Sequence, residues 1–306
     1  MKTFVVVNPA AAGGRAGKHW PRISRELKSA IGDFDSALTK RPGEASALVR
    51  NAIANGAKTV IAVGGDGTIN EAVNGLSNTD ALPPGDVSFG FVMYGTGGDF
   101  RRSLDFPKGV SAAIERLKSG RTQVIDLGRL SYTAPNGTKA QRWFNNISSF
   151  GFSGEVVRAV NAARFSKLLG GKFSFFWNSF IELRKYQGCK VDITIDGKTI
   201  SENVCTAAIC NGRFFGGGMQ VAPGADPADG ARDLTLWQGF GLRDFVLQRR
   251  RIYDGTHVRL PGTRTGRILR LRAESDERVA VDLDGEALGQ LPLEIEVLPA
   301  ALTLLS

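Results

Sequence analysis

Three glycines surround one aspartate in the segment GGDGT, residues 64–68, and this spacing suits phosphate chemistry. Glycine lets the main chain approach a ligand closely and adopt conformations that are closed to residues with a Cβ. An apolar run ends at Val63 and a helical pattern begins near Ile69, so the loop leads from a buried strand to a helix N-terminus, which favours anions. Asp66 would repel phosphates unless a divalent cation or a proton in transfer lies between them. The loop therefore predicts a Mg²⁺-nucleotide site, although a tight strand–helix turn alone would explain the glycines.

A second candidate centre is the sequence Asp284-Gly285-Glu286. Phosphoryl transfer needs a carboxylate that accepts the proton of the attacking hydroxyl. Since the chain has only two histidines, carboxylates are the expected acid–base groups. A β-hairpin turn explains Asp284 and Gly285 equally well, and an exposed glutamate after a turn is common.

The first part of the chain alternates strand and helix patterns, which predicts a parallel sheet covered by helices. The expected strands are 4–9, 34–39, 58–63 and 87–95, and the expected helices are 19–31, 43–55, the segment after residue 68, and 110–120. Ligands of such sheets bind beyond the carboxyl ends of the strands. The turns that begin at Asn8, Gly64 and Gly95 all lie at that edge.

From about Gln123 onward, short strands separated by turns replace this alternation. The change predicts an α/β plus all-β protein: an N-terminal parallel α/β nucleotide-binding domain over residues 1–124, and a C-terminal antiparallel β-sandwich domain over residues 125–290. A helical insertion is expected at about 155–185. The closing segment, about 291–306, is expected to pack back on the first domain.

Charge and cysteine content limit the kind of protein. The net charge of +9 points to an anionic partner, which could be a nucleotide, an anionic membrane surface or a nucleic acid; a solvated basic surface explains it equally well. The three cysteines form no CxxC pair, which argues against a disulfide framework and against zinc. The N-terminal apolar run is too short for a signal peptide, and no stretch approaches the roughly 18 apolar residues of a membrane-spanning helix. We expect a cytoplasmic enzyme.

Six segments occur in one order along the chain: NPAAAGGRAG (8–17), GGDGT (64–68), YGTGGDFRRSL (94–104), NNISSFGFSGEV (145–156), GGGMQVAPGADPADGARDLTL (216–236) and VDLDGE (281–286). Together they resemble the diacylglycerol kinase catalytic-domain family, specifically the stand-alone bacterial lipid kinases of the YegS/DgkB type. The resemblance covers nearly the whole chain and implies the two-domain layout described above. It also implies Mg²⁺-dependent transfer of the γ-phosphoryl group of ATP to a hydroxyl of diacylglycerol or a related lipid.

Residue by residue, the resemblance implies the following ATP-binding positions: Asn8, Gly13, Gly14, Thr39, Gly64, Gly65, Asp66, Gly67, Thr68, Ile69, Asn70 and Thr96, with Asp99 as a further carboxylate nearby. It implies that Glu286 is the base, with Asp284 close by. A structural Mg²⁺ is implied at Asp226, Asp229 and Ala231, where a metal-free turn is the alternative.

One departure affects the ATP loop. Relatives usually read GT-x-NDF-A, whereas this chain has Gly98 before Asp99 and Arg101 after Phe100. Loss of the amide could weaken a nucleotide or loop contact, while Arg101 could add a phosphate or headgroup contact.

The lipid side is expected at a membrane surface. The segment 171–186 combines aromatic and basic residues at helical spacing, which suits either a helix on an anionic membrane or a core helix. The run Arg249 to Arg251 could face anionic lipid or solvent. We expect a peripheral protein at the inner membrane face without a nucleic-acid partner, and a homodimer is compatible with the sequence.

Two other functions remain open. A soluble NAD kinase shares GGDGT, but this alternative leaves the GGGM and DGE segments unaccounted for. A non-catalytic protein that binds lipid or nucleotide on the same fold is the third; the retained Asp66, Asp99 and Glu286 argue against it, while Gly98 keeps it open.

Overall fold

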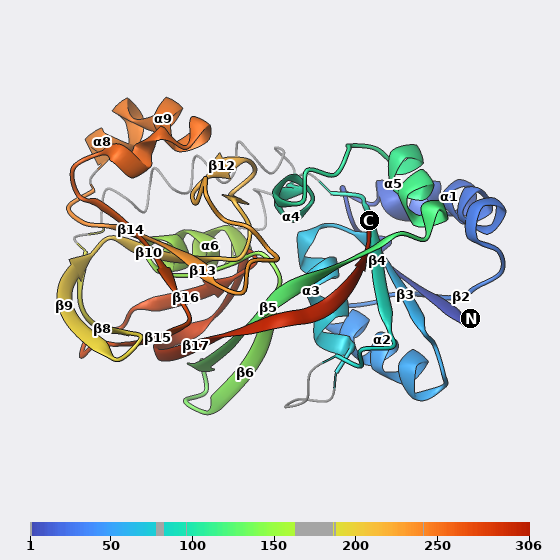
Figure 1. The fold of residues 1–306 in the computed structure, drawn as a ribbon, viewed down its shortest axis with the longest axis horizontal. Coiled ribbons are helices and arrows are strands. Elements are labelled where there is room, and N and C mark those ends of the chain that lie inside the picture. Colours follow the sequence, from blue (N-terminus) through green and yellow to red (C-terminus); the bar gives the residue numbers. More distant parts are fainter. Residues whose placement is uncertain (1, 78–82, 96, 163–185, 187, 241) are drawn as a thin grey trace.

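Two parts of different architecture make up the fold, one rich in helices and one built mainly of strands (Figure 1). The computed structural model describes residues 2–77, 83–95, 97–162, 186, 188–240 and 242–306. The elements of the first part are β1 (Thr3–Val7), α1 (Arg15–Ile31), β2 (Asp35–Leu38), α2 (Glu44–Ala54), β3 (Thr59–Gly64), α3 (Asp66–Gly75), β4 (Ser88–Met93), α4 (Asp99–Ser103) and α5 (Val110–Ser119).

The second part continues the chain with mostly short strands. Its elements are β5 (Thr122–Thr133), β6 (Lys139–Phe144), β7 (Ile147–Gly151), α6 (Phe152–Ala162), β8 (Cys189–Ile195), β9 (Lys198–Val204), β10 (Thr206–Cys210), β11 (Phe214–Phe215), β12 (Met219–Gln220), β13 (Arg232–Trp237), α8 (Leu242–Leu247), α9 (Arg249–Asp254), η2 (Thr256–Arg259), β14 (Thr263–Ile268), β15 (Arg270–Glu274), β16 (Ala280–Leu283) and β17 (Glu286–Leu305).

The first part contains the predicted parallel sheet, with strand order β4-β3-β1-β2. Alternate residues of β3 enter two separate cores, because the sheet has helices on both faces. Val60 packs on the side of α2 and α3, whereas Ile61 packs on the side of α1 and α5. Burial on both faces explains why these strands are continuously apolar.

The longest strand, β17, connects the two parts. It pairs with β5 along most of its length, and its end pairs in parallel with β4 through Thr303 and Leu304. Arg116 of α5 fixes this end, because its guanidinium donates to the carbonyls of Leu305 and Phe91. The last residues of the chain thus lie against the sheet of the first part.

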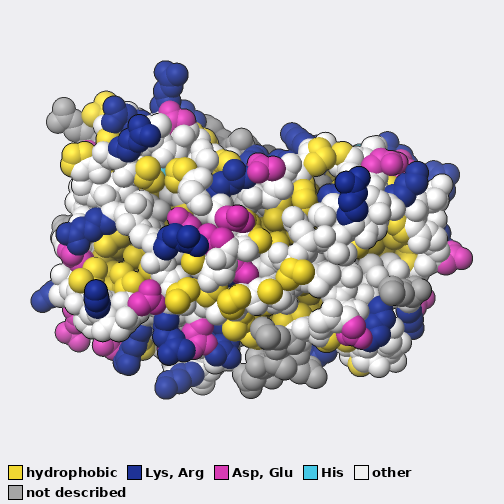
Figure 2. All heavy atoms as spheres, viewed as in Figure 1, with side chains coloured by type: hydrophobic (Ala, Val, Ile, Leu, Met, Phe, Trp, Pro, Cys, Tyr) yellow, Lys and Arg dark blue, Asp and Glu magenta, His cyan; other side chains and the backbone are white. Residues whose placement is uncertain are grey.

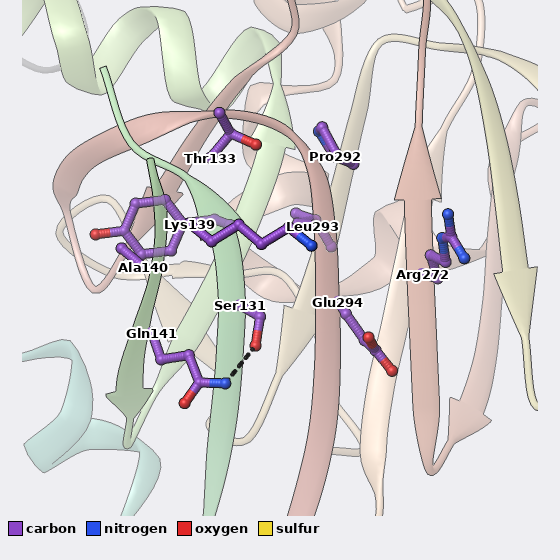
Figure 3. Close-up of a pocket in the computed structure, with 10 residues that line it drawn as sticks. Ser131, Thr133, Lys139, Ala140, Gln141, Arg272, Pro292, Leu293 and Glu294 are labelled. Atoms are coloured by element: carbon purple, nitrogen blue, oxygen red, sulfur yellow. Dashed lines mark hydrogen bonds between the residues drawn. The ribbon is translucent and has the colours of Figure 1, made fainter. Parts of the chain in front are cut away.

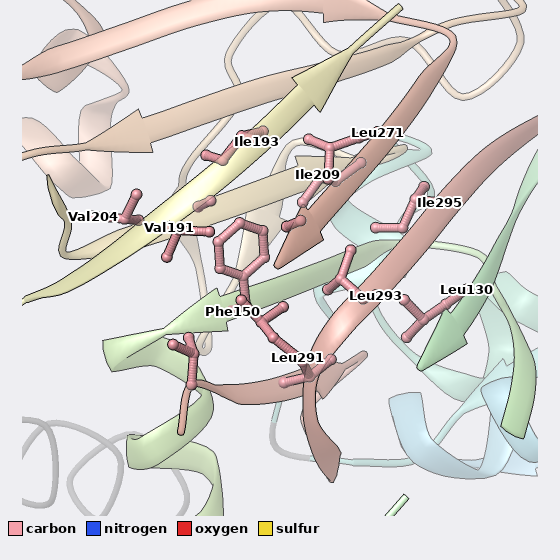
Figure 4. Packing of buried hydrophobic residues seen from close by; sticks show 14 of the residues in the cluster. Leu130, Phe150, Val191, Ile193, Val204, Ile209, Leu271, Leu291, Leu293 and Ile295 are labelled. Carbon is pink, nitrogen blue, oxygen red and sulfur yellow. The ribbon is translucent and has the colours of Figure 1, made fainter. Parts of the chain in front are cut away.

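The second part has its own core beneath antiparallel strands (Figure 4). Along β15, Leu271 and Ala273 are buried while Arg270, Arg272 and Glu274 are exposed, as expected for a sheet with one solvated face. The α/β plus all-β fold class is therefore confirmed. All three cysteines are buried and free.

Several short helices were not predicted. The helix α4 has five residues, and α8 and α9 have six each, which is too short for a clear 3.6-residue periodicity. Of the predicted insertion at 155–185, the structure describes the first turns as α6; residues 163–185, with most of the basic-aromatic segment, lie outside the described residues. Within the described parts of the chain, no helix is long and apolar enough to cross a membrane.

Candidate active site

A pocket of about 570 Å³ lies where β1 to β4 end. Six of the predicted nucleotide-binding residues line it: Asn8, Thr39, Gly65, Asp66, Gly67 and Thr68. Lys40 and Arg41, which were not predicted as site residues, add two basic side chains to the wall. Two acidic side chains, Asp66 and Glu71, line the same pocket, so its charged side chains are balanced and the N-terminus of α3 is the feature that suits phosphates.

Glycines bring the loops of this pocket into backbone contact. A Cβ at Gly95 would lie 2.8 Å from the Cα of Gly65, so the turns after β3 and β4 touch. A Cβ at Gly64 would lie 2.6 Å from the Thr68 hydroxyl oxygen, which in turn accepts a hydrogen bond of 3.0 Å from the Asn8 amide. Any larger residue at Gly64 or Gly95 would force these loops apart.

The other predicted nucleotide contacts have varied surroundings. Gly13 and Gly14 lead into α1 with positive φ angles of 68° and 87°, which favour glycine. Ile69 points into the core on the side of the sheet that α2 and α3 cover, so only its backbone could meet a ligand. Asn70 is fully buried, and Thr96 lies outside the described residues.

Asp66 has a structural role that its sequence position did not reveal. Its carboxylate accepts hydrogen bonds from the backbone N–H groups of Gly98 (2.7 Å) and Phe100 (3.2 Å) at the start of α4. A Cβ at Gly97 would lie 2.7 Å from the same carboxylate, so this loop wraps tightly around it. Because Asp66 also lines the pocket, it connects the phosphate loop to the turn after β4.

The change to Gly98 preserves the backbone of this turn. Gly98 has φ 71° and ψ 35°, the left-handed conformation that glycine and asparagine tolerate best. Replacing the usual asparagine by glycine therefore removes an amide while keeping the main-chain path. Arg101 donates to the carbonyl of Phe106, so in this structure it supports the local loop.

Asp99 is not among the residues that line the pocket, and it joins the two parts of the fold. Its carboxylate accepts hydrogen bonds from the Gly217 N–H (2.7 Å) and from Arg102 (2.6 Å). Burial, followed by the nearby negative charge of Asp66, raises the pKa of Asp99 to about 6. These contacts hold the glycine-rich 216–218 loop against α4.

The second predicted centre lies against the first. One carboxylate oxygen of Glu286, Oε1, would be 3.5 Å from a Cβ placed on Gly67. The other oxygen, Oε2, accepts a 2.8 Å hydrogen bond from Arg142, and the side chain of Glu286 remains 32% exposed. Arg142 also donates to the Asn70 side chain at 3.1 Å. A carboxylate from the second part thus faces the phosphate loop of the first.

Asp284 is placed differently from Glu286. Its carboxylate accepts hydrogen bonds from the Asn70 amide (2.7 Å) and from the backbone N–H groups of Asn145 (3.3 Å) and Ile147 (2.8 Å). Burial raises the pKa of Asp284 to about 7 against the opposite effect of these donors. With both oxygens occupied, Asp284 fixes the turn that presents Glu286.

Asp282 lies two residues before this turn and supports a pH-dependent prediction. Its carboxyl group accepts a hydrogen bond from Ser149, and burial raises its pKa to about 7. In the unfolded chain the group ionises near pH 4. Between about pH 4 and 7 the folded state therefore holds a proton that the unfolded state has lost. As the pH rises through this range, the free energy of unfolding falls by up to about 1.4 kcal/mol per pH unit.

We expect Asp282→Asn to reduce this fall, measured by urea unfolding at about pH 5 and about pH 7. Asp284 contributes a similar slope, so part of the fall should remain. Exposed Asp192→Asn is the matched control and should leave the slope unchanged. An unaltered slope in the Asp282 variant would contradict the assignment.

The predicted structural metal site at residues 226–231 has its oxygen atoms engaged by other groups. The Asp229 carboxylate accepts hydrogen bonds from Arg267 (2.5 Å) and from the Ala231 N–H (3.0 Å). The Ala231 carbonyl accepts a 2.7 Å hydrogen bond from buried Arg232, while Asp226 bonds to the Ala228 N–H two residues on. Two guanidinium groups therefore donate to oxygen atoms that were predicted to bind Mg²⁺, and their positive charge disfavours a further cation there, while the metal site itself stays a prediction.

Arg142, Lys40 and Arg41 are the site residues that the sequence analysis missed. Lys40 and Arg41 follow β2, Arg142 lies within β6, and none of the recognised motifs contains them. The only usable signal was the Asn145-Asn146 pair after β6, which the recognised segment 145–156 included without a role.

A second hollow, of about 690 Å³, lies over β5, β6, β15 and β17 (Figure 3). Lys139, Arg272 and Glu294 stand along separate strands there, and Gln141 bonds to Ser131 at 3.1 Å. Its lining residues are outside the predicted site, and they follow the solvated face of the sheet. We therefore place the chemistry at the first pocket.

A phosphate-binding loop that faces a carboxylate from a second, all-β part is the arrangement of a nucleotide-dependent phosphotransferase. Residues 2–130 match the diacylglycerol kinase catalytic domain family, and residues 146–306 match the YegS C-terminal NAD kinase beta sandwich-like domain. The chain therefore belongs to the YegS-type branch of the diacylglycerol kinase catalytic-domain proteins. It is a kinase of the lipid kinase class.

Relatives extend over nearly the whole chain. A diacylglycerol kinase of Mycobacterium tuberculosis (strain CDC 1551 / Oshkosh) is 29% identical over 306 residues, which cover 99% of this chain and 94% of that protein. A diacylglycerol kinase of Bacillus subtilis (strain 168) is 26% identical, covering 95% and 91%. The crystal structure of a diacylglycerol kinase from Bacillus anthracis str. Sterne shares the fold, with a TM-score of 0.71 at 22% identity over 99% of this chain and 96% of that one.

Proposed function

We propose that this enzyme transfers the γ-phosphoryl group of ATP to a hydroxyl of diacylglycerol or a related lipid. The observation that carries the proposal is the position of Glu286, whose Oε1 lies beside Gly67 of the phosphate loop. ATP would occupy the 570 Å³ pocket, with its phosphates at the N-terminus of α3. In this arrangement residues 1–124 with about 291–306 bind ATP, and residues 125–290 bind the lipid at the inner membrane face.

Each carboxylate has a separate role in this proposal. Glu286 accepts the proton of the lipid hydroxyl as that oxygen attacks the γ-phosphorus. Arg142 holds Glu286 in place, and Asp284 anchors the turn through Asn70. Asp66 keeps one lone pair on each oxygen beyond its backbone hydrogen bonds, so it fits a Mg²⁺ that enters with ATP. When bound, Mg²⁺ neutralises phosphate charge.

A narrow apolar cavity of about 50 Å³ in the second part suits the end of an acyl chain. Its lining includes Val156, Met219 and Ile252, and Met219 is flexible enough to make room. Ser153 lines the same cavity and shares a hydrogen bond with Ser149, which reaches Asp282. The cavity is thus connected to the strand that presents Glu286.

Lipid selectivity should respond to the size of this cavity. We expect Val156→Phe to lower kcat/KM for long-chain diacylglycerol at least tenfold more than for short-chain diacylglycerol, because the larger ring fills the space. Met219→Ala should shift the preference toward longer chains. Rates with a series of chain lengths measure both. If kcat/KM fell by the same factor for every chain length in both variants, the substitutions would have destabilised the enzyme in general.

We propose no Mg²⁺ at residues 226–231, because the guanidinium groups of Arg267 and Arg232, which donate to the Asp229 carboxylate and the Ala231 carbonyl, would repel a further cation. Chelation by EDTA should therefore leave the thermal unfolding midpoint unchanged, while Arg267→Ala should lower it slightly, since the ion pair with Asp229 is exposed. A clear fall in the midpoint with EDTA would restore the metal site.

Labelled ATP offered with diacylglycerol, with mixed lipids or with NAD tests the proposal. Labelled phospholipid that requires Mg²⁺ and is absent with Glu286→Ala supports it. Labelled NADP would instead favour the NAD kinase alternative, and ATP binding without transfer would favour a non-catalytic protein.

A further inference from the structure

The outer surface of α8, α9 and η2 differs from the rest of the molecule's described surface. Five large hydrophobic side chains are exposed among the described residues, and the only two that are adjacent are Val246 (48% exposed) and Leu247 (64%) at the end of α8. In monomeric proteins single exposed apolar residues are common, whereas paired ones beside charges often mark a contact surface.

Arginines surround this apolar pair. Residues 242–259 contain five arginines and two aspartates. Arg250, Arg251 and Arg259 are exposed and form no ion pair with any described residue. By contrast, the exposed arginines of β14 and β15 are paired with acids: Arg264 with Glu202, Arg267 with Asp229, Arg270 with Glu296 and Arg272 with Glu274. Of these elements, only α9 and η2 therefore have described arginines that are exposed and form no ion pair. Asp254 is their one acid, and its pKa is lowered by hydrogen bonds from Thr256 and then by the charges of Arg250 and Arg251.

The helix α9, which carries Arg250 and Arg251, also closes the apolar cavity. Ile252 of α9 is buried and lines it, together with Trp237 and Met219 from the strands below. The α9 helix thus has an apolar inner side toward the cavity and a basic outer side. Figure 2 shows basic side chains gathered with hydrophobic ones over these helices, at the upper left of the molecule.

We infer that α8, α9 and η2 form the membrane-docking surface, and that its partner is an anionic phospholipid leaflet. Arginines beside exposed aliphatic side chains fit the headgroup boundary, where charge and acyl chains are both within reach. The position of Ile252 places this surface over the cavity that a lipid chain would enter. The inference rests on the proposed lipid kinase function, which it deepens by naming the surface that meets the substrate bilayer.

Vesicle sedimentation without ATP tests the docking surface. The probe is phosphatidylcholine vesicles with and without phosphatidylglycerol, at low and at high salt. We expect wild-type protein to bind only the anionic vesicles, and to bind them less as salt rises. Combined Arg250→Ala, Arg251→Ala and Arg259→Ala substitutions should weaken binding about 10²-fold, since each arginine contributes roughly fivefold. Val246→Ser with Leu247→Ser should weaken it about tenfold.

A control removes three positive charges elsewhere, two of which are paired with acids, Arg22 with Glu26 and Lys28 with Asp33. Arg22, Arg25 and Lys28 lie exposed on α1, at the far end of the molecule (Figure 1). Their triple alanine variant should bind anionic vesicles within about threefold of wild type, as expected for charges beyond a Debye length from the leaflet. Circular dichroism spectra and melting midpoints that match those of the wild type would show that all variants fold.

The outcomes separate docking from catalysis. Phosphorylation of a detergent-dispersed short-chain diacylglycerol should stay near the wild-type rate in both α8–α9 variants, because no bilayer is needed. Vesicle binding that is unaffected by these variants, or reduced equally by the α1 control, would overturn the docking surface while leaving the kinase proposal intact. Preference for an RNA duplex over anionic vesicles would likewise overturn it. If the α8–α9 variants alone lost vesicle binding, but the wild-type protein phosphorylated no lipid, the result would support the docking surface and reject the proposed function.

Discussion

Glu286→Gln should lower kcat by about 10²–10⁴, the usual contribution of a positioned general base, and leave the affinity for ATP nearly unchanged. Glutamine keeps the shape of the side chain and an oxygen for Arg142, so the contact now seen at 2.8 Å can persist. What the variant loses is the capacity to take a proton beside the phosphate loop. Initial rates at saturating ATP and lipid, with fluorescence titration of ATP, give the two quantities.

Glu294→Gln is the matched control for this substitution. Glu294 lies on the same strand, β17, but is exposed on the solvated face of the sheet. The same chemical change there should leave kcat within about twofold. If Glu286→Gln kept its full kcat, or lost ATP binding instead, the base would have to be sought elsewhere. Asp284 is a poor substitute, because its two oxygens already accept three hydrogen bonds.

Local patterns were sufficient to predict the strands and the longer helices of the first part. The apolar run that ends at Val63 and the GGDGT loop specified a strand, a turn and a helix, because backbone conformation there depends on neighbours in sequence. The resemblance to known lipid kinases brought in Glu286, more than two hundred residues away. In the structure Glu286 lies beside Gly67, so the two candidate centres are neighbours.

Contacts between distant residues were beyond such patterns. Arg142 belongs to a strand with no motif, and only the pairing of β5 with β6 carries it to Glu286. The two arginines at the 226–231 turn are a similar case. Arg267 reaches Asp229 because β13 and β14 are neighbours, a fact that the spacing of ADPADGA does not contain. Side-chain partners across strands depend on register, which is fixed by the whole sheet.

Asp66 is the residue whose role changes most between sequence and structure. As a phosphate-loop acid it suggests a contact to Mg²⁺-ATP; as an acceptor for the Gly98 and Phe100 N–H groups it also holds the turn after β4. Both roles predict that Asp66→Ala severely lowers the activity. We expect kcat to fall by at least about 10³-fold, because charge stabilisation and loop position are lost together. The free energy of unfolding should fall by only about 1–2 kcal/mol, as for a lost helix cap.

Asp99→Asn separates the two contributions. Asp99 binds the backbone of a neighbouring loop and Arg102, but it does not line the pocket. Asp99→Asn therefore loses loop support alone. Its free energy of unfolding should fall about as much as that of Asp66→Ala, while its kcat should fall much less. The dependence of rate on Mg²⁺ concentration adds a direct readout. Asp66→Asn keeps an acceptor oxygen for one of the two N–H groups, and it should need more Mg²⁺ than wild type for half-maximal rate. Asp99→Asn should need the same Mg²⁺ concentration as wild type. Activity within about threefold of wild type in Asp66→Ala, less than 1 kcal/mol of barrier, would remove Asp66 from the chemistry and leave it as a support for the loop.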